Sequence, residues 1–369
     1  MARNRVIYQS EALYVSEDLG SQTTGGHFQL ERVQSANYNF TINRQDINQY
    51  GQAARIDSLV MDAPTVGLDF TYYLTDGGNE KALGFDVGDT NQFAQGHMTT
   101  SSGKNFYIVT VDEGKDAVGA VHADRKSVIG LGNAFLSDYS VDLSVGSLPT
   151  VSVSMECSNI NSTTTDLAGD ATQITDISLP AVDITDGTPY SGTGISLADP
   201  TTGESTLTAL RPGDITVDIS SLDGVALSDL TGPNEDDAIH IQSASLSVPL
   251  SRTPLQRLGT RFNYARTVDF PVNVTLSVNA ICNDATQENL ATILDDNAGY
   301  NVTVTLNDKD GNSQMKYTLK GCRIDSESFS SSIGSNKSVD LTFSTQVGGT
   351  NDTDNGIFAL GGFTDAVFS

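Results

Sequence analysis

The feature that most constrains this chain is that its sequence repeats itself. Residues 34–51 read QSANYNFTINRQDINQYG, and residues 242–259 read QSASLSVPLSRTPLQRLG, at an offset of 208 without a gap. Apolar residues occupy matching alternate positions in the two segments: Tyr38 and Leu246, Phe40 and Val248, Ile42 and Leu250. Alternation with a period of two is typical of a β-strand, which we expect to end near the shared Arg and to turn at the shared Gly.

A second block follows downstream in both copies. Residues 62–73 correspond to residues 269–280, and each segment contains a clean alternating strand. The alternating apolar residues are Val66, Leu68, Phe70 and Tyr72 in the first copy and Val272, Val274, Leu276 and Val278 in the second. A short segment of helical character follows each strand, at 79–85 and at 284–296. The pattern therefore predicts a strand and then a short helix in each copy.

A third block closes each copy, with residues 131–155 corresponding to 319–343 at an offset of 188. Since the offset falls from 208 to 188, the first copy carries about twenty more residues in its middle, and we expect them in the Gly-rich loop 86–104. Convergent strand composition is the simpler alternative for any single block. Three collinear blocks with the same alternation favour a tandem duplication.

The sequence thus predicts a mostly β fold with two tandem β-sandwich or half-barrel modules, each with a short flanking helix, joined by an irregular β-rich insertion. The predicted divisions are module one at 1–156, a linker or insertion rich in strands and turns at 157–237, module two at 238–349, and a C-terminal tail at 350–369. The insertion contains a strand-like piece, DITVDIS, at 214–220. The tail carries aromatic residues that we expect to be exposed, where they pack on a neighbour or fray: Phe358, Phe363 and Phe368.

The composition is typical of a β protein, and its charge is not typical of a protein that binds nucleic acid. Charged residues make up only 18% of the chain, there is no Trp, and Leu, Ala, Glu and Lys rarely recur at helical spacing. The net charge of −26 argues against ordinary nucleic-acid binding, because affinity for phosphate comes from Lys and Arg. The same acidity is equally well explained as an aid to solubility.

The cysteines and the N-terminal segment point to a reducing compartment. Cys157, Cys282 and Cys322 are widely spaced and form no CxxC pair, so we expect free thiols. The opening MARNRVIYQS lacks an apolar core of a signal peptide, and no stretch of about 18 apolar residues occurs. The sequence therefore predicts a protein made in the cytoplasm, with no membrane segment.

Signatures of catalysis, cofactor binding and metal binding are missing from the sequence, so we expect no enzyme, no cofactor and no metal site. The four histidines form no HxH or HExxH arrangement, and no nucleophile elbow or phosphate-binding loop is present. The most calcium-like segment is NDKDGN at 307–312, but its glycine stands too early for an EF-hand. A hairpin turn at Asp310-Gly311, between strands at 301–306 and 314–319, is the better explanation.

The run SLSVPLSRTPLQRLGTRFNYARTVDFPVNVTLSVNAI at 245–281 resembles the core of phage tail tube proteins. Through the internal repeat the resemblance extends to the first copy, although Met61-Asp62-Ala63-Pro64 departs from Asp269-Phe270-Pro271. It implies modules that assemble into hexameric rings, stacked around a channel that conducts DNA during ejection. Since this chain carries two modules, we expect a homotrimer with pseudo-sixfold symmetry.

The resemblance also implies partners and a location. The partners would be further copies of the chain, other tail proteins such as a sheath, terminator or baseplate, and genomic DNA that passes without specific binding. The protein would be assembled in the host cytoplasm and would reside in the virion tail. If the apolar residues of the alternating strands face the core, their neighbours face the opposite side. The candidate lumen-facing residues are Asp69, Thr71, Asn273, Thr275, Ser277 and Asn279. An outer-surface position for the same residues is an equal alternative.

Three other functions are compatible with the sequence. The first is a baseplate or tail-end ring protein built from the same module. The second is a secreted acidic β-rich surface protein or adhesin, which the missing signal peptide and the free cysteines disfavour. The third is a carbohydrate-active enzyme with paired carboxylates, which the absence of Trp disfavours.

Overall fold

The computed structural model describes residues 10–16, 27–99, 103–118, 125–164, 180–183, 210–221, 240–281, 299–330, 336 and 338–362. Within these residues the predicted fold class is confirmed, because most of the regular structure is antiparallel strand and the helices are short. No closed barrel forms in this part of the chain.

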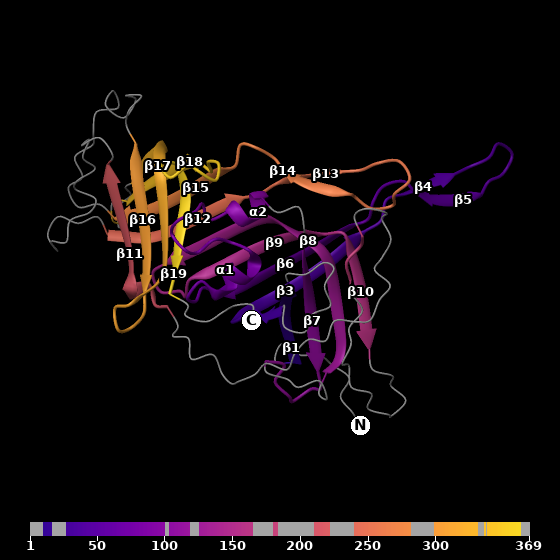
Figure 1. The fold of residues 1–369 in the computed structure, drawn as a ribbon, viewed down its shortest axis with the longest axis horizontal. Helices are drawn as coiled ribbons and strands as arrows, with labels where there is room; N and C mark the ends of the chain where they lie inside the picture. Colours follow the sequence, from indigo (N-terminus) through magenta and orange to yellow (C-terminus); the bar gives the residue numbers. More distant parts are fainter. Residues whose placement is uncertain are drawn as a thin grey trace.

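The first half of the described chain contains ten strands and two short helices, which we call the first module (Figure 1). The strands are β1 (Glu11–Ser16), β2 (His27–Gln29), β3 (Val33–Thr41), β4 (Arg44–Ile47), β5 (Asp57–Val60), β6 (Thr65–Tyr73), β7 (Lys104–Val111), β8 (Arg125–Ser144), β9 (Thr150–Cys157) and β10 (Asn159–Thr164). The helices, α1 (Gly78–Leu83) and α2 (Gln95–Thr99), lie between β6 and β7. The helical character predicted at 79–85 is therefore confirmed, whereas the segment 284–296 lies outside the described residues.

The second half contains nine described strands, which we call the second module. They are β11 (Ile215–Ser221), β12 (His240–Pro249), β13 (Arg252–Leu255), β14 (Ala265–Val268), β15 (Asn273–Ile281), β16 (Tyr300–Asn307), β17 (Ser313–Ser330), β18 (Ser338–Gln346) and β19 (Gly356–Gly361). A 3-10 turn at Pro212–Asp214 precedes β11.

The two modules pair their strands in the same order. In the first module β3 pairs with β6, β6 with β9, and β9 with the C-terminal half of β8. In the second module β12, β15, β18 and the C-terminal half of β17 follow in the same way. The N-terminal half of β8 pairs with β7 and β10, as that of β17 pairs with β16 and β19. Each module is thus a four-stranded layer with a second layer packed over it. The second layer contains β1, β2, β7, β10 and the N-terminal half of β8 in the first module, and β11, β16, β19 and the N-terminal half of β17 in the second.

The strand pairing corrects the register that the sequence pattern gave for the second block. Leu68 lies opposite Met155, and Leu276 lies opposite Phe343, so β6 and β15 correspond at an offset of 208. Residues 34–73 therefore match 242–281 without a gap. The predicted alternating residues Val272, Val274, Leu276 and Val278 are all buried, and Ala280 continues the pattern. What changes is the match between the copies: Val66 corresponds to Val274 and not to Val272. A pattern of period two looks the same after a shift of two residues, and for that reason it could not fix the register.

The extra residues of the first copy lie in two places, and the loop 86–104 accounts for only part of them. At β7 the offset is 196, because Phe106 and Val302 face the equivalent residues Leu131 and Leu319. Twelve residues are therefore added before β7, in the stretch that holds α1 and α2. The other eight are added between β7 and β8, where the second copy has only the tight turn 308–312.

Strands from the predicted linker and tail belong to the modules. The strand-like piece predicted at 214–220 is β11, which pairs with β16 as β1 pairs with β7. Residues 159–164 form β10, and residues 356–361 form β19, its counterpart in the second module. Phe358 of β19 is 1% exposed, so the expectation of an exposed aromatic is wrong at this position. Because β19 pairs with β17 along one edge and packs on the core, its aromatic side chain is buried. Phe363 and Phe368 lie outside the described residues.

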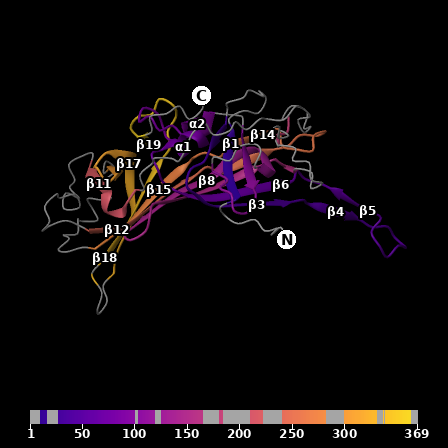
Figure 2. The same ribbon diagram turned by 90° about the horizontal axis from the view of Figure 1, so that it is seen from below.

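One continuous sheet joins the modules. The C-terminal half of β8 pairs with β12 from Ser144 opposite Ser243 to Asp138 opposite Pro249. This pairing, which we call the joint, links the two four-stranded layers in the order β3-β6-β9-β8-β12-β15-β18-β17. Seen from below, the eight strands form an arch, and α1, α2, β1, β11 and β19 lie over its convex side (Figure 2). The polar side of the strands is left on the concave side.

The hydrophobic core lies between the arch and the elements on its convex side. It runs through both modules as one cluster and is rich in aromatic residues, with Phe85 and Phe93 stacked at 4.1 Å between ring centroids. Each fully buried large apolar side chain contributes roughly 1.5–3 kcal/mol. No helix in the described part of the chain is long and apolar enough to cross a membrane.

Candidate functional site

The concave side of the arch carries a polar surface that both modules build in the same way. The strands β6 and β15 share one burial pattern, in which every second side chain is buried and its neighbours are exposed or half-buried. All six candidate lumen-facing residues lie on this polar side: Asp69, Thr71, Asn273, Thr275, Ser277 and Asn279. We call this surface the concave face. Whether it lines a channel stays a prediction.

Hydrogen bonds between neighbouring strands hold the acidic groups of the concave face in place. The Ser154 hydroxyl donates to Asp69 at 2.7 Å, the Ser245 hydroxyl donates to Asp142 at 2.7 Å across the joint, and Asn279 donates to Asp340 at 2.5 Å. The strand positions of this face in β3, β6, β9, β12, β15 and β18 are Ser, Thr, Asn and Asp with few exceptions, and none is Lys or Arg. On β17, Arg323 lies opposite Ser344 and so belongs to the same face. The face is therefore neutral to acidic apart from this arginine.

One end of the arch is an exposed strand edge with apolar side chains. Tyr38, Phe40 and Ile42 on and after β3 are 42%, 58% and 38% exposed. Their counterparts Leu246, Val248 and Leu250 in the second module are 4%, 0% and 0% exposed. The sequence pattern is the same in both copies, so the difference comes from the surroundings. The first module covers the three side chains of the second copy, whereas no described element buries Tyr38, Phe40 and Ile42.

The other end of the arch is the C-terminal half of β17. At the joint the equivalent half of β8 pairs on both sides, with β9 and with β12. The residues Ser326–Ser330 of β17 pair with β18 on one side. No described strand pairs with them on the other. At the joint, β8 pairs with β12. Their counterparts in the other module, β17 and β3, are the two strands at the ends of the arch.

A buried polar network lies beneath the joint. Glu80 of α1 is 0% exposed, and its Oε1 accepts hydrogen bonds from the hydroxyls of Tyr72 at 2.7 Å and Tyr139 at 3.1 Å. The Tyr139 hydroxyl lies 2.7 Å from that of Tyr317 on β17. Burial raises the pKa of Glu80, and the two hydroxyl donors only partly oppose this. Because Tyr317 belongs to the second module, the network fastens the two modules together.

The calcium-like segment is a hairpin turn, as predicted. It connects β16 to β17, and Gly311 takes a positive φ of 85°. The Asp308 carboxylate accepts hydrogen bonds from the side-chain amide and the backbone N–H of Asn312, from the backbone N–H of Asp310 and from the Gln314 side chain. These donors lower the pKa of Asp308 to about 2. The carboxylate is thus used to hold the turn.

Other candidates for chemistry are buried in the core. Cys157 and Cys322 are free, as expected, and Cys282 lies outside the described residues. Both described cysteines are buried, and burial raises the pKa of each thiol to about 12. His97 of α2 is buried as well. Among the residues that the structure describes, no three His, Cys, Asp or Glu side chains gather as a set of metal ligands.

Sequence reasoning missed the hairpin that follows the first strand of each copy. The shared Arg, expected near the strand end, begins a new strand, and the shared Gly lies at the hairpin tip with φ of 85° at Gly51 and 92° at Gly259. We call β4–β5 with its flanking residues 42–61 the first hairpin, and β13–β14 with residues 250–269 the second hairpin. The ungapped match of 34–51 to 242–259 was the signal that both copies form the same hairpin.

Comparisons with known proteins add little to the geometry. No protein-family model matches the chain, and no curated protein matches it. Among solved structures, it is similar to a chain of the anti-feeding prophage baseplate, determined by electron cryomicroscopy with sixfold symmetrisation. The TM-score is 0.30 at 10% identity, over 45% of this chain and 100% of that chain. A similarity of this size carries no argument about function.

Proposed function

We propose that this protein is the structural subunit of a phage tail tube, and that its copies join edge to edge into rings that stack around a channel for DNA. The proposal needs no catalytic centre and no cofactor. The subunit would act through its shape, its two strand edges and the charge of its concave face.

The joint between the modules carries this proposal. The β8–β12 pairing shows, within one chain, the strand register in which one module pairs with the next. Applied to the ends of the arch, the same register sets Tyr38 of β3 opposite Phe329 of a second copy, Phe40 opposite Glu327, and Thr41 opposite Ser326. Pairing would satisfy two open rows of backbone groups and would cover Tyr38, Phe40 and Ile42. Open edges and exposed apolar side chains otherwise favour aggregation.

Repetition of one head-to-tail contact produces a ring when its rotation closes, and we propose that it does so here. Each chain contributes eight strands of the arch, and a curved sheet that continues from chain to chain closes on itself without edges. The resemblance to tail tube proteins, whose rings hold six modules, supports three chains per ring with pseudo-sixfold symmetry.

The concave face would then line the channel. Its side chains are mostly Ser, Thr, Asn and Asp, which offer hydrogen-bonding groups to water and DNA; outside Arg323 on β17, the described strands of the arch place no cation there that would replace the counterions around phosphate. DNA would therefore slide past without binding. Sheath, terminator or baseplate proteins would contact the outside and the ends of the tube, and the assembled protein would reside in the virion tail after assembly in the host cytoplasm.

Electron microscopy of the purified, concentrated protein tests the proposal. We expect hollow tubes, and averaged cross-sections with threefold symmetry and six similar modules. Single rings that do not stack would favour a tail-end or baseplate ring built from the same contact. A protein that stays monomeric at every concentration would refute self-assembly through these edges.

A further inference from the structure

The two hairpins have the same backbone pairing at every position. Arg44 lies opposite Val60 as Arg252 lies opposite Val268, and the pairs that follow keep the offset of 208. The residues at the two tips, Tyr50 and Leu258, are both fully exposed, at 104% and 103%. The hairpins are therefore equivalent structures in two different surroundings.

The second hairpin is fastened to the first module. Arg252 is 7% exposed, and its guanidinium donates to the carbonyl oxygens of His97 at 2.7 Å and Leu136 at 3.4 Å. Arg266 forms an ion pair with Glu156 at 2.6 Å and donates to the carbonyl of Cys157. Buried guanidinium groups that reach carbonyl oxygens hold the hairpin in one place.

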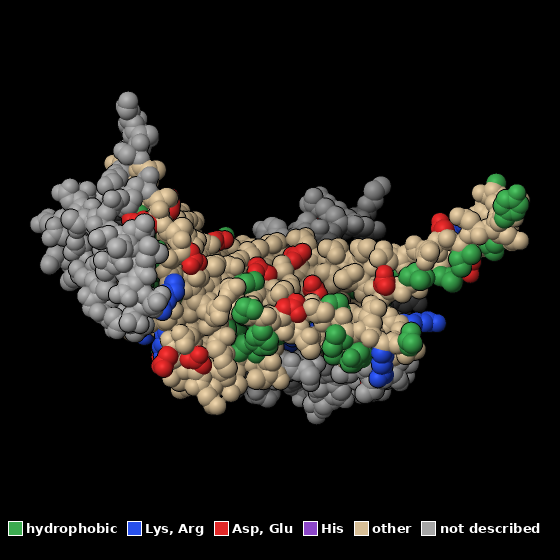
Figure 3. Space-filling model, turned by 90° about the horizontal axis from the view of Figure 1, so that it is seen from above, with side chains coloured by type: hydrophobic (Ala, Val, Ile, Leu, Met, Phe, Trp, Pro, Cys, Tyr) green, Lys and Arg blue, Asp and Glu red, His purple; other side chains and the backbone are tan. Residues whose placement is uncertain are grey.

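The first hairpin has no such support in the described structure. It projects beyond the arch, whereas β13 and β14 lie over the first module (Figure 1). Arg44, the counterpart of Arg252, is exposed. Apolar side chains gather along the projecting hairpin (Figure 3). They are 38% to 104% exposed: Ile42, Ile47, Tyr50, Ile56, Leu59, Val60 and Met61.

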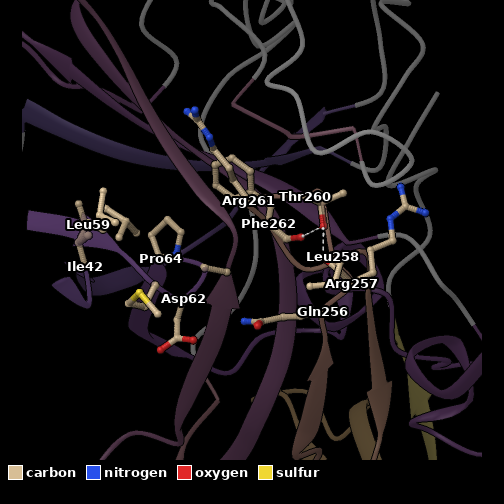
Figure 4. A pocket seen from close by; sticks show the side chains of 14 residues that line it. Ile42, Leu59, Asp62, Pro64, Gln256, Arg257, Leu258, Thr260, Arg261 and Phe262 are labelled. Carbon is tan, nitrogen blue, oxygen red and sulfur yellow. Dashed lines mark hydrogen bonds between the residues drawn. The ribbon is translucent and has the colours of Figure 1, made fainter. Parts of the chain in front are cut away.

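The tip of the second hairpin lies against the base of the first hairpin, and this contact is a template for the tip of the first hairpin. Residues 256–262 at this tip and residues 59–64 at the base of the first hairpin line one pocket. In Figure 4, Ile42, Leu59 and Asp62 stand on one side of it, and Gln256 and Leu258 stand on the other. The tip of one hairpin thus meets the base of the preceding one.

We propose that the first hairpin docks on the second module of another copy with this same geometry. Arg44 would then donate to the carbonyl of Ile324, which is the counterpart of Leu136. Tyr50 would lie at the base of the partner's second hairpin, beside Phe270, the counterpart of Asp62. Phe270 is 65% exposed in the single chain, as is expected of a side chain that a partner covers. This inference rests on the proposed self-assembly and adds a second contact to the strand edges.

Cross-linking between different chains tests the docking. One preparation carries Tyr50→Cys and another carries Phe270→Cys; the two are mixed under assembly conditions and treated with a short bismaleimide. We expect a covalent dimer on a denaturing gel, and no dimer from either variant alone. The matched control is a single chain with Leu258→Cys and Asp62→Cys, the equivalent pair, which should cross-link within the chain and keep the monomer mass.

Substitution of the two equivalent arginines gives an independent measurement. Arg252→Ala removes hydrogen bonds within the chain and should lower the melting temperature of the monomer. Arg44→Ala should leave that temperature unchanged and raise the protein concentration needed for assembly by about tenfold, because one charged hydrogen-bonding group is lost per contact. Tubes that form without the Tyr50–Phe270 cross-link, and with Arg44→Ala at normal concentration, would overturn the docking alone. Absence of any assembly would overturn the proposed function as well.

Discussion

The hydroxyl groups of Tyr139 and Tyr317 lie 2.7 Å apart, although the residues are 178 positions apart in sequence and belong to different modules. Both side chains are buried, and Tyr139 also donates to Glu80. A chain of hydrogen bonds therefore runs from β17 through β8 to α1, directly below the joint. A buried hydroxyl that loses its partner is costly, so the network favours one arrangement of the two modules and with it one curvature of the arch.

Removal of the Tyr317 hydroxyl should weaken this connection. Tyr317→Phe keeps the ring in the core but leaves Tyr139 with one partner fewer. We expect the free energy of unfolding to fall by about 1 kcal/mol. Denaturant titration of the dilute monomer measures it, with Tyr38→Phe on the exposed β3 edge as the control that should have no effect. Equal effects of both variants would show that the network does not stabilise the fold.

Glu80 should make stability depend on pH. Because its pKa is raised from 4.5 in the folded state, the folded chain binds more protons than the unfolded chain above pH 4.5. Stability from this group is thus fully present below pH 4.5 and falls as pH rises toward the raised pKa. Glu80→Gln should flatten this part of the curve of melting temperature against pH and raise the melting temperature at pH 8. Glu327→Gln on exposed β17 is the control, and an unchanged curve for Glu80→Gln would contradict the assignment.

Much of the fold could be predicted from sequence because the duplication preserves alternation strand by strand. The repeat at 34–51 and 242–259 predicted β3 and β12, and Asp310-Gly311 predicted the turn between β16 and β17. The register of β15 could not be predicted, because alternation alone does not distinguish a shift of two. The sequence did not predict that β10, β11 and β19 belong to the modules. Each of them pairs with a strand that is distant in sequence, and composition does not show such pairing.

Of the candidate site, the sequence predicted the polar residues of the concave face but not the exposed strand edges or the hairpins. Alternation along β6 and β15 predicted which residues share the concave face. The difference between Phe40 and Val248 could not be foreseen, because identical patterns become buried or exposed according to the neighbouring module. The hairpins were missed because Pro254 and the tip glycines are typical of a simple turn. The domain boundaries themselves stay a prediction.

The strand edge at β3 offers a matched pair of substitutions. Phe40→Lys places a charge on an exposed edge, so the monomer should fold normally, whereas assembly should be lost because a buried Phe contributes roughly 1.5–3 kcal/mol per contact. Val248→Lys, at the equivalent position of the joint, buries the same charge inside the chain and should unfold the protein. Circular dichroism measures folding, and sedimentation measures assembly. Normal tubes from Phe40→Lys would exclude β3 from the contact between chains.

The concave face leads to a prediction about DNA passage. A lysine on this face can exchange with the counterions around phosphate, so each ring would hold the moving DNA weakly but repeatedly along the whole tube. Thr275→Lys and Asp69→Lys should therefore slow ejection from assembled particles, and the delay should shrink as salt concentration rises. Thr216→Lys adds the same charge on β11, over the convex side, and should leave the rate unchanged. If all three variants eject at the normal rate, the concave face does not contact DNA; if Thr216→Lys alone is slow, the channel lies on the other side of the sheet.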